Sequence, residues 1–360
     1  MRSRTALATL ATLGATLLAL VLANPASAAP PSRFRVANLI SDQPGQAPLV
    51  DPKLVNAWGL ALSPTGGPLW VANNGTNTAT VYAGGVNGAT PTKNPLEVTI
   101  PGGAPTGQVF NNTNGFIIPP SGSSGGGKAL FIFASEGGDI TAWSPTVLPT
   151  AAVTVAHVAG AIYKGLAILH VGNTVLLLAA DFHDARIDVF DASFRHLPSM
   201  SANFTDPRIP TGFAPFNVVA TQGGNGVFVS YAKQDAEAED EVAGGGLGFV
   251  DRFDGLGDMP LRIASRGTLN APWGMAIAPA SFGSLAGALL VGNFGDGRIG
   301  AYRDGRFSGL LHMPRGGPIV IDGLWALLPG TATTGGTGSL WFSAGPDDEA
   351  HGLVGEILPA

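Results

Sequence analysis

Cysteine is absent from this chain of 360 residues. Without thiols the protein can form neither disulfides nor a thiolate metal site, and it has no thiol nucleophile. Charged residues are also scarce, at 12% of the chain. Helical periodicity appears over no useful length, whereas the 52 glycines and 28 prolines are typical of a chain with many turns. These features together favour an all-β fold.

Known nucleophile and nucleotide-binding motifs are lacking as well. The sequence contains no HExxH, no P-loop and no G-x-G-x-x-G before a helix, and the spacing G-x-S-x-G occurs only inside the glycine- and serine-rich loop at 121–128. Its six histidines are scattered without the spacing of a zinc site. The sequence therefore assigns no catalytic residue.

The first residues have the composition of a secretory signal peptide. Two arginines precede an apolar run over residues 5–23, which ends in a small-x-small cleavage site at Ala28. A transmembrane anchor is the alternative, although the run barely reaches the roughly 20 residues that a span needs. We expect residues 1–28 to be a signal peptide cleaved near Ala28. The mature protein, residues 29–360, would then be secreted to the periplasm or the exterior, without stable membrane insertion.

The mature chain is acidic. Once the two arginines of the signal peptide are removed, 17 basic residues stand against 25 acidic ones, a net charge of −8. An acidic protein repels phosphate groups, which argues against nucleic acid and anionic membranes as partners.

A unit that recurs six times dominates the mature chain. Each copy opens on a small residue that begins an apolar strand, at steps of 48 to 58 residues, and continues with a second apolar strand and a third, alternating strand. Such a period with four short strands per unit is the signature of a β-propeller. We therefore predict an all-β fold, a six-bladed β-propeller of four-stranded blades that forms one domain over residues 29–360. The openers are Gly59, Gly107, Gly165, Asn217, Gly274 and Gly323.

The fourth, outer strand is missing from the last unit. The chain ends soon after the third strand of that unit, yet residues 34–40 form a strand that precedes the first unit and has no other partner. We expect this N-terminal strand to complete blade six and to close the ring, because closure removes an exposed sheet edge. An incomplete seventh blade is the alternative. The other five outer strands are predicted at 96–100, 153–158, 199–204, 261–265 and 309–313.

One face of the predicted propeller is strongly acidic. Strands alternate in direction along a blade, so the loop that enters the first strand and the loop between the second and third strands lie on the same face. Thirteen of the 25 acidic residues fall in or beside these second-to-third-strand loops, which makes this face the favoured functional one. They are Glu136, Asp139, Asp181, Asp184, Asp235, Glu237, Glu239, Asp240, Glu241, Asp296, Asp347, Asp348 and Glu349.

The residue before each opener is expected to point into the central channel. Blades three and six lie opposite each other, so Lys164 would face Asp322 with aromatic rings between them. The channel mouth is then either a small-ligand pocket with a few convergent polar groups or a plug in which the rings fill space. The ring reads Trp58, Thr106, Lys164, Phe216, Trp273 and Asp322, and a pocket would also include Asn217.

Two acidic segments suggest a bound cation. Residues 344–352 place three acids in a row, and residues 180–188 put an Asp and a His on the same side of a strand. Carboxylate and carbonyl oxygens are the ligands that Ca²⁺ prefers, so Ca²⁺ is the expected cofactor. Charged turns in solvent are the alternative, as they are for the acidic run at 232–246. The candidate ligands are Asp181, His183, Asp347, Asp348 and Glu349.

Several longer segments carry a family resemblance. They include NLISDQPGQAPLVDPKLVNAWGLALSP, ADFHDARIDVFD, SRGTLNAPWGMAIAP and AGPDDEAHG, and together such segments cover nearly all of the mature chain. In these segments the protein resembles a family of exported bacterial proteins known as conserved hypothetical proteins. The resemblance implies a six-bladed propeller but no particular activity.

A wider resemblance is to NHL-type propellers and to calcium-dependent lactonases of the gluconolactonase kind. The segment IDGLWAL resembles the strand opening that carries a metal ligand there, which would fall on Asp322. The pattern departs elsewhere, because Trp58 stands where those enzymes have a ligating Glu, and no opener reads Pro-Asn-Gly.

Two functions of different classes remain open from the sequence. The first is a binding protein that holds a small molecule or a protein partner on its acidic face, with a structural Ca²⁺. The alternative is a metal-dependent hydrolase of the lactonase or esterase type, in which a cation in the channel polarises a carbonyl and activates water. A third, purely structural role predicts a plugged channel.

Overall fold

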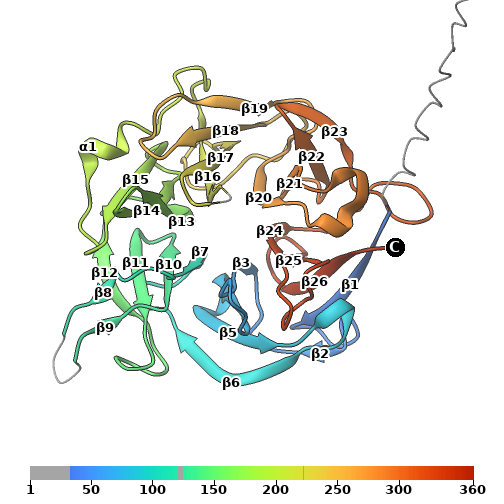
Figure 1. The fold of residues 1–360 in the computed structure, drawn as a ribbon, viewed down its shortest axis with the longest axis horizontal. Coiled ribbons are helices and arrows are strands. Elements are labelled where there is room, and N and C mark those ends of the chain that lie inside the picture. Colours follow the sequence, from blue (N-terminus) through green and yellow to red (C-terminus); the bar gives the residue numbers. More distant parts are fainter. Residues whose placement is uncertain (1–32, 121–124, 222) are drawn as a thin grey trace, which may run out of the picture. The chain divides into compact units, whose positions relative to one another are not determined.

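The computed structural model describes residues 33–120, 125–221 and 223–360. Figure 1 shows six small sheets arranged around a central axis, each running outward from an inner strand. The predicted all-β, six-bladed propeller is confirmed. The inner strands are β3 (Ala57–Ala61), β7 (Pro105–Phe110), β13 (Tyr163–Val171), β16 (Phe213–Ala220), β20 (Pro272–Ile277) and β24 (Leu324–Pro329).

The second and third strands follow in antiparallel order in every blade. Several second strands are buried along their whole length, because neighbouring blades cover both of their faces. The second strands are β4 (Leu69–Asn73), β10 (Phe131–Ser135), β14 (Thr174–Asp181), β17 (Gly226–Lys233), β21 (Leu289–Asn293) and β25 (Leu340–Ala344). The third strands are β5 (Thr78–Ala83), β11 (Asp139–Trp143), β15 (Arg186–Asp191), β18 (Gly248–Asp254), β22 (Ile299–Arg303) and β26 (Leu353–Pro359).

The outer strands follow the prediction except in blade three. In blades one and five the strands begin four and three residues earlier than expected, and in blade three the predicted strand at 199–204 is wrong. That segment begins with the short helix α1 (Pro198–Ser201), which Pro198 can start because it has a fixed φ and needs no N–H partner. Ser201 Oγ accepts a 3.1 Å hydrogen bond from the N–H of Val189 and so covers part of the edge of β15. The outer strands are β6 (Thr92–Thr99), β12 (Val153–His157), β19 (Leu261–Ser265) and β23 (Arg306–Leu310).

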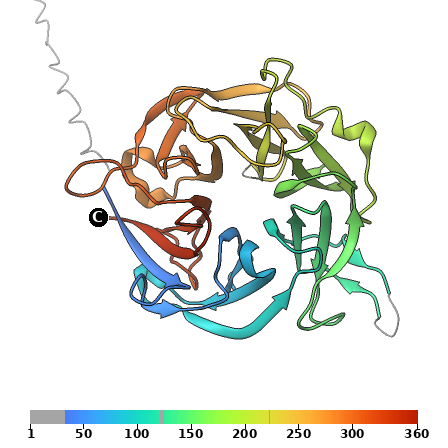
Figure 2. The ribbon, with the colours of Figure 1, turned by 180° about the vertical axis from the view of Figure 1, so that it is seen from behind.

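The N-terminal strand closes the ring as predicted. Strand β1 (Phe34–Ser41) pairs antiparallel with β26 from Phe34 opposite Pro359 to Ser41 opposite Leu353. The short β2 (Leu49–Val50) then adds to β1 in parallel. Figure 2 shows the blue N-terminal strand beside the red C-terminal one. The alternative of an incomplete seventh blade is therefore wrong, because β1 is the outer strand of blade six.

The remaining elements are short and belong to loops. Strands β8 (Ile117–Ile118) and β9 (Gly127–Lys128) pair as a small hairpin in blade two. Three 3₁₀ turns, η1 (Asn74–Thr76), η2 (Val86–Gly88) and η3 (Ala280–Leu285), lie between strands. Within the described part of the chain, no helix has the length and apolar character needed to cross a bilayer. The predicted signal peptide, residues 1–28, lies outside the described residues, so export and cleavage stay predictions.

Glu356 on β26 is a buried carboxyl group where blade six meets blade one. Its side chain is 0% exposed, and its Oε2 accepts a 2.8 Å hydrogen bond from the N–H of Gly88. Among the described residues, its Oε1 has no hydrogen-bond partner, and the same holds for Nε1 of the neighbouring Trp341. Burial raises the pKa of Glu356 to about 8, since the Gly88 N–H offsets only part of the desolvation.

The seam closed by β1 yields a first prediction. Phe34 is 0% exposed and its ring centroid lies 4.6 Å from that of Phe282. Phe34→Ala should lower the free energy of unfolding by about 3–5 kcal/mol, as expected for a large cavity in a core. The matched control is Phe307→Ala, because Phe307 is 48% exposed. Urea denaturation measures both, and equal losses in the two variants would contradict the seam.

The raised pKa of Glu356 yields a prediction about pH. The folded protein holds this proton more tightly than the unfolded chain, in which the pKa is about 4.5. The resulting contribution to the free energy of unfolding is fully present below pH 4.5 and is lost as the pH rises through about 8. Glu356→Gln should therefore reduce the fall in stability across this window, whereas Glu97→Gln, which removes a half-exposed carboxylate, should not. Denaturation curves at several pH values test this, and a variant that keeps the full wild-type slope would refute it.

Candidate functional site

The inner strands share a break in pairing that sets the central ring of side chains. In each blade the register between the first and second strands shifts near the start of the inner strand. In blade six this shift lies between Leu324 and Leu327. The residue that corresponds to Trp58 and Trp273 is therefore Trp325, three positions after Asp322. The predicted place of Asp322 in the ring is wrong, because the inner strand begins only after the Asp-Gly pair.

Aromatic rings from four blades pack against one another at this end of the channel. The ring centroids of Trp58 and Trp325 lie 3.6 Å apart in a stack, and Phe294 stacks on Trp325 at 4.0 Å. Trp273 and Phe216 meet Trp325 edge-on at 6.0 and 5.9 Å. Trp58 and Trp325 are 1% and 0% exposed. This aromatic plug, as we call these five rings, matches the plugged alternative of the sequence analysis.

Lys164 lies beside the aromatic plug in an acidic setting. Its ammonium group donates to Glu136 and, at 3.0 Å, to Asp240, and it sits 5.4 Å from the centre of a Trp58 ring. Burial by itself would lower the pKa of Lys164, but the charges of Glu136 and Asp240 raise it above its usual value. The side chain is 1% exposed and remains an ammonium ion.

The predicted pairing of Lys164 with Asp322 is wrong. Asp322 is exposed at the entry to β24, and its carboxylate accepts a 3.1 Å hydrogen bond from the N–H of Asp347. The partners of Lys164 come instead from the second-to-third-strand loops of blades two and four. These loops lie where the sequence placed them, since backbone bonds join them to the entries of the inner strands, as from Phe182 N to Ile162 O.

Amides and carboxylates continue from Lys164 as a hydrogen-bonded network. Asn74 donates at 2.9 Å to the second oxygen of Glu136, Asn56 donates to Asn74 and to Glu349, and Trp325 Nε1 donates at 2.9 Å to Asn56. Burial raises the pKa of Glu349, although the hydrogen bond from Asn56 opposes this effect. The network thus links blades one, two and six to Lys164. Some of the acidic residues on this face, such as Glu136 and Glu349, therefore have a structural role as hydrogen-bond acceptors.

The candidate metal ligands have separate partners. Asp181 is 0% exposed and accepts 3.2 Å bonds from the N–H groups of Ile162 and Asp184, and burial raises its pKa to about 6. The exposed His183 contacts Ala238 O at 3.3 Å. Across residues 33–120, 125–221 and 223–360, no group of three or more His, Asp or Glu side chains is arranged to hold a metal ion. Calcium binding at Asp347, Asp348 or Glu349, which lie in a turn with positive φ, stays a prediction.

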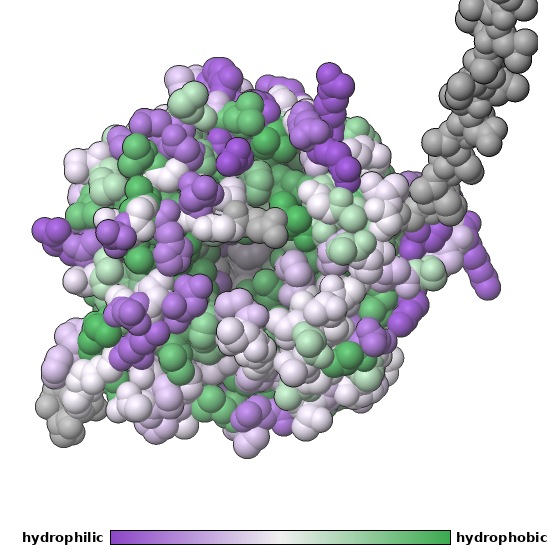
Figure 3. Space-filling model, in the orientation of Figure 1, coloured by the Kyte–Doolittle hydropathy of each residue, from purple (hydrophilic) through white to green (hydrophobic). Residues whose placement is uncertain are grey.

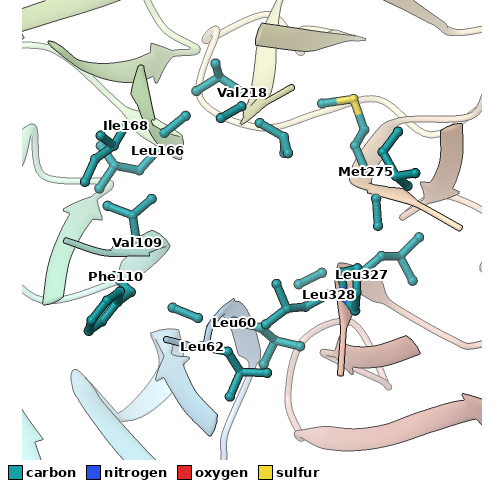
Figure 4. A pocket seen from close by; sticks show the side chains of 18 of the residues that line it. Leu60, Leu62, Val109, Phe110, Leu166, Ile168, Val218, Met275, Leu327 and Leu328 are labelled. Atoms are coloured by element: carbon teal, nitrogen blue, oxygen red, sulfur yellow. The ribbon is translucent and has the colours of Figure 1, made fainter. Parts of the chain in front are cut away.

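The opposite end of the channel is hollow. A cavity of about 890 Å³ lies beyond the aromatic plug and is lined by the later residues of all six inner strands. Figure 3 shows the hollow at the centre of this face, and Figure 4 shows apolar side chains surrounding an open space. Asn217 and Trp273, both predicted as channel residues, also line this cavity. Its labelled apolar residues are Leu60, Leu62, Val109, Phe110, Leu166, Ile168, Val218, Met275, Leu327 and Leu328.

Sequence reasoning missed these lining residues for an identifiable reason. These residues follow the openers within apolar strands, which are typical of a buried core, whereas the acidic loops pointed to the opposite face. A signal was nevertheless present, because the residue directly after the opener is Leu, Val or Met in four of the first five units and Gln108 in the remaining one. Apolar residues at equivalent places around a ring converge near its axis. Asn217 is satisfied within the wall, where it donates at 2.9 Å to Trp273 O.

These features define a class of protein, a six-bladed β-propeller whose channel is plugged at an acidic face and open as an apolar cavity at the other. Within that class the chain belongs to a family that includes two proteins of Acanthamoeba polyphaga mimivirus. Uncharacterized protein R648 is 34% identical over 333 residues, which cover 90% of this chain and 80% of that protein. Uncharacterized protein L690 is 35% identical over 337 residues, or 90% of this chain and 86% of that protein. These relatives are viral, whereas the sequence segments suggested bacterial ones.

Likeness to solved structures concerns the fold alone. The virginiamycin B lyase of Staphylococcus aureus has a TM-score of 0.50 at 13% identity, and the match covers 91% of this chain and 100% of that one. A putative gluconolactonase has a TM-score of 0.42 at 18% identity, over 62% of this chain and 72% of that one. No family model matches the chain.

The partners of Lys164 and Asp322 lead to opposite expectations for two substitutions. Lys164→Met leaves Glu136 and Asp240 without their cation. It should cost on the order of 2–3 kcal/mol, less than for a fully buried pair because Asp240 is 73% exposed. Asp322→Asn should stay within about 0.5 kcal/mol of the wild type. Thermal and urea unfolding, with the exposed Lys53→Met as control, measure both; a larger loss for Asp322→Asn than for Lys164→Met would reverse the assignment.

Proposed function

We propose that the protein binds a small apolar molecule in the central cavity. The observation that carries this proposal is the asymmetry of the channel, which is closed by stacked aromatic rings at one end and open at the other. Ligand pockets usually have volumes of roughly 300–1,000 Å³ and mainly apolar walls with a few polar groups. The cavity, at about 890 Å³, lies in this range.

The lining indicates what kind of molecule would fit. Its apolar side chains come from all six blades, and His170 is the only titratable residue among the described residues that line it. A charged ligand would lose its hydration there without gaining a counter-ion. An apolar ligand, by contrast, gains roughly 25 cal/mol for each Å² of apolar surface that leaves water.

This proposal moves the ligand site away from the acidic face favoured by the sequence. At that face the aromatic rings and Lys164 occupy the channel, which supports a structural role for the residues once expected to form a mouth. A protein partner for the acidic face stays a prediction. We propose no hydrolysis, because Asp322, Asn217 and Asp181 have separate hydrogen-bond partners and show no common centre.

Binding of a neutral fluorescent probe tests the proposal. N-phenyl-1-naphthylamine brightens in apolar surroundings and should bind the wild-type protein saturably, with energy transfer from Trp273 in the cavity wall. Leu328→Glu places a charge on the half-buried lining and should weaken binding by about tenfold or more, or at least 1.4 kcal/mol. The matched control is Leu261→Glu on the outer strand β19, where the side chain is 56% exposed. Absence of saturable binding, or equal affinities for the two variants, would count against the cavity.

A further inference from the structure

A second cavity adjoins the central one and differs from it in chemistry. It has a volume of about 640 Å³ and lies between blades two and three on the same face of the propeller. Three segments form its walls: residues 113–115 after β7, residues 173–175 where the chain turns into β14, and residues 191–193 at the end of β15. His170 near the end of β13 lines both cavities. The apolar space and this second space therefore meet at one side chain.

The walls of the second cavity are rich in uncharged hydrogen-bonding groups. Asn114, Asn173 and Ser193 are exposed on it and offer amide and hydroxyl groups. No Lys or Arg lines it among the described residues, and the neighbouring Arg195 is already paired with Asp191. The lining therefore offers no unpaired cation to a phosphate or a carboxylate. Amide and hydroxyl groups can both donate and accept hydrogen bonds, so these walls would suit a ligand group that carries several hydroxyls.

Asp191 adds a carboxylate whose charge is already balanced. Its Oδ2 accepts a 3.0 Å bond from Arg195 Nε, and its Oδ1 accepts bonds from the N–H groups of Ser193 and Arg195 at 2.9 and 3.0 Å. Although partial burial acts in the opposite direction, these bonds lower the pKa of Asp191, so it stays an acceptor at neutral pH. The lone pairs that remain on this carboxylate can accept hydrogen bonds from hydroxyl groups of a ligand.

His170 is placed to contact a ligand where the two cavities meet. Its backbone N–H is fixed by a 2.8 Å bond to Gly224 O, whereas its half-buried imidazole makes no hydrogen bond to another described residue. The ring nitrogens are therefore free to meet a ligand that passes from one cavity into the other. An oxygen that joins an apolar part to a polar part would lie at this position.

We propose that the two cavities together bind an amphiphile, with its apolar chain in the central cavity and an uncharged, hydroxyl-rich head group, such as a glycosyl group, in the polar one. This inference rests on the proposed function and names the ligand class for that site. Either a free alkyl glycoside or a glycolipid in a membrane has this chemistry.

Displacement of N-phenyl-1-naphthylamine by matched ligands tests the head group. Octyl β-glucoside, kept below its critical micelle concentration, should displace the probe at about tenfold lower concentration than octan-1-ol or octanoate, which share its chain length. Equal potency of octyl glucoside and octan-1-ol would overturn the amphiphile proposal and leave apolar binding intact. Failure of the probe itself to bind would instead remove the proposed function.

Substitutions in the polar cavity locate the head group. The double substitution Asn114→Ala and Asn173→Ala should weaken the binding of octyl glucoside by about tenfold and leave the affinity for octan-1-ol unchanged. Asn94→Ala, at an exposed position on the outer strand of blade one, is the control. If the substitutions weakened the binding of both ligands equally, the polar cavity would not be the site that recognises the head group. Vesicles with and without a glucosyl lipid then identify the source: retention by the glycolipid vesicles supports a membrane lipid, and binding of the monomer alone supports a free amphiphile.

Discussion

The close approach of the inner strands around the axis sets the geometry on which the rest of the molecule depends. A Cβ on Gly107 would lie 2.5 Å from the backbone nitrogen of Leu166 in the next blade, and a Cβ on Gly274 would lie 2.5 Å from the carbonyl oxygen of Trp325. A side chain larger than hydrogen does not fit at such distances, so glycine is required at these two contacts between blades. Six strands held this close leave a channel that a few aromatic rings can span. The same spacing brings apolar residues of all six blades to one cavity further along the axis.

The two ends of this channel differ in their chemistry. At the acidic end, packed aromatic rings fill the channel, and Lys164 supplies the positive charge between Glu136 and Asp240. At the open end, the wall is mainly apolar, and Asn114, Asn173 and Ser193 add exposed hydrogen-bonding groups to one side, in the cavity between blades two and three. A molecule that enters from the open face therefore meets an apolar space with one polar flank. Such an arrangement supports the proposed binding of an amphiphile.

The fold was predictable because its signals are local and repeated. Each opener precedes an apolar strand, and the lone N-terminal strand had one free edge to pair with, so the six blades and their closure followed from pattern. The predicted strands were wrong at two places where a local feature of the sequence departed from the repeated pattern. Pro198 turned a strand-like segment into a helix, and the Asp-Gly pair before Leu324 resembled an opener although the strand starts after it. Because the strand starts three residues later than expected, Trp325 rather than Asp322 lies in the ring. Lys164 therefore pairs with carboxylates other than Asp322.

The sequence by itself thus determined the blade number, the position of the seam and the side on which the acidic loops gather, since all three depend on order along the chain. Only the tertiary structure decided which carboxylates pair with Lys164, which end of the channel is closed and where a ligand could enter. These properties depend on contacts between residues far apart in sequence, such as Trp58 with Trp325 and Lys164 with Asp240. Convergence at a common axis depends on the register of every inner strand, because a shift of one residue turns a side chain from the channel into the space between blades.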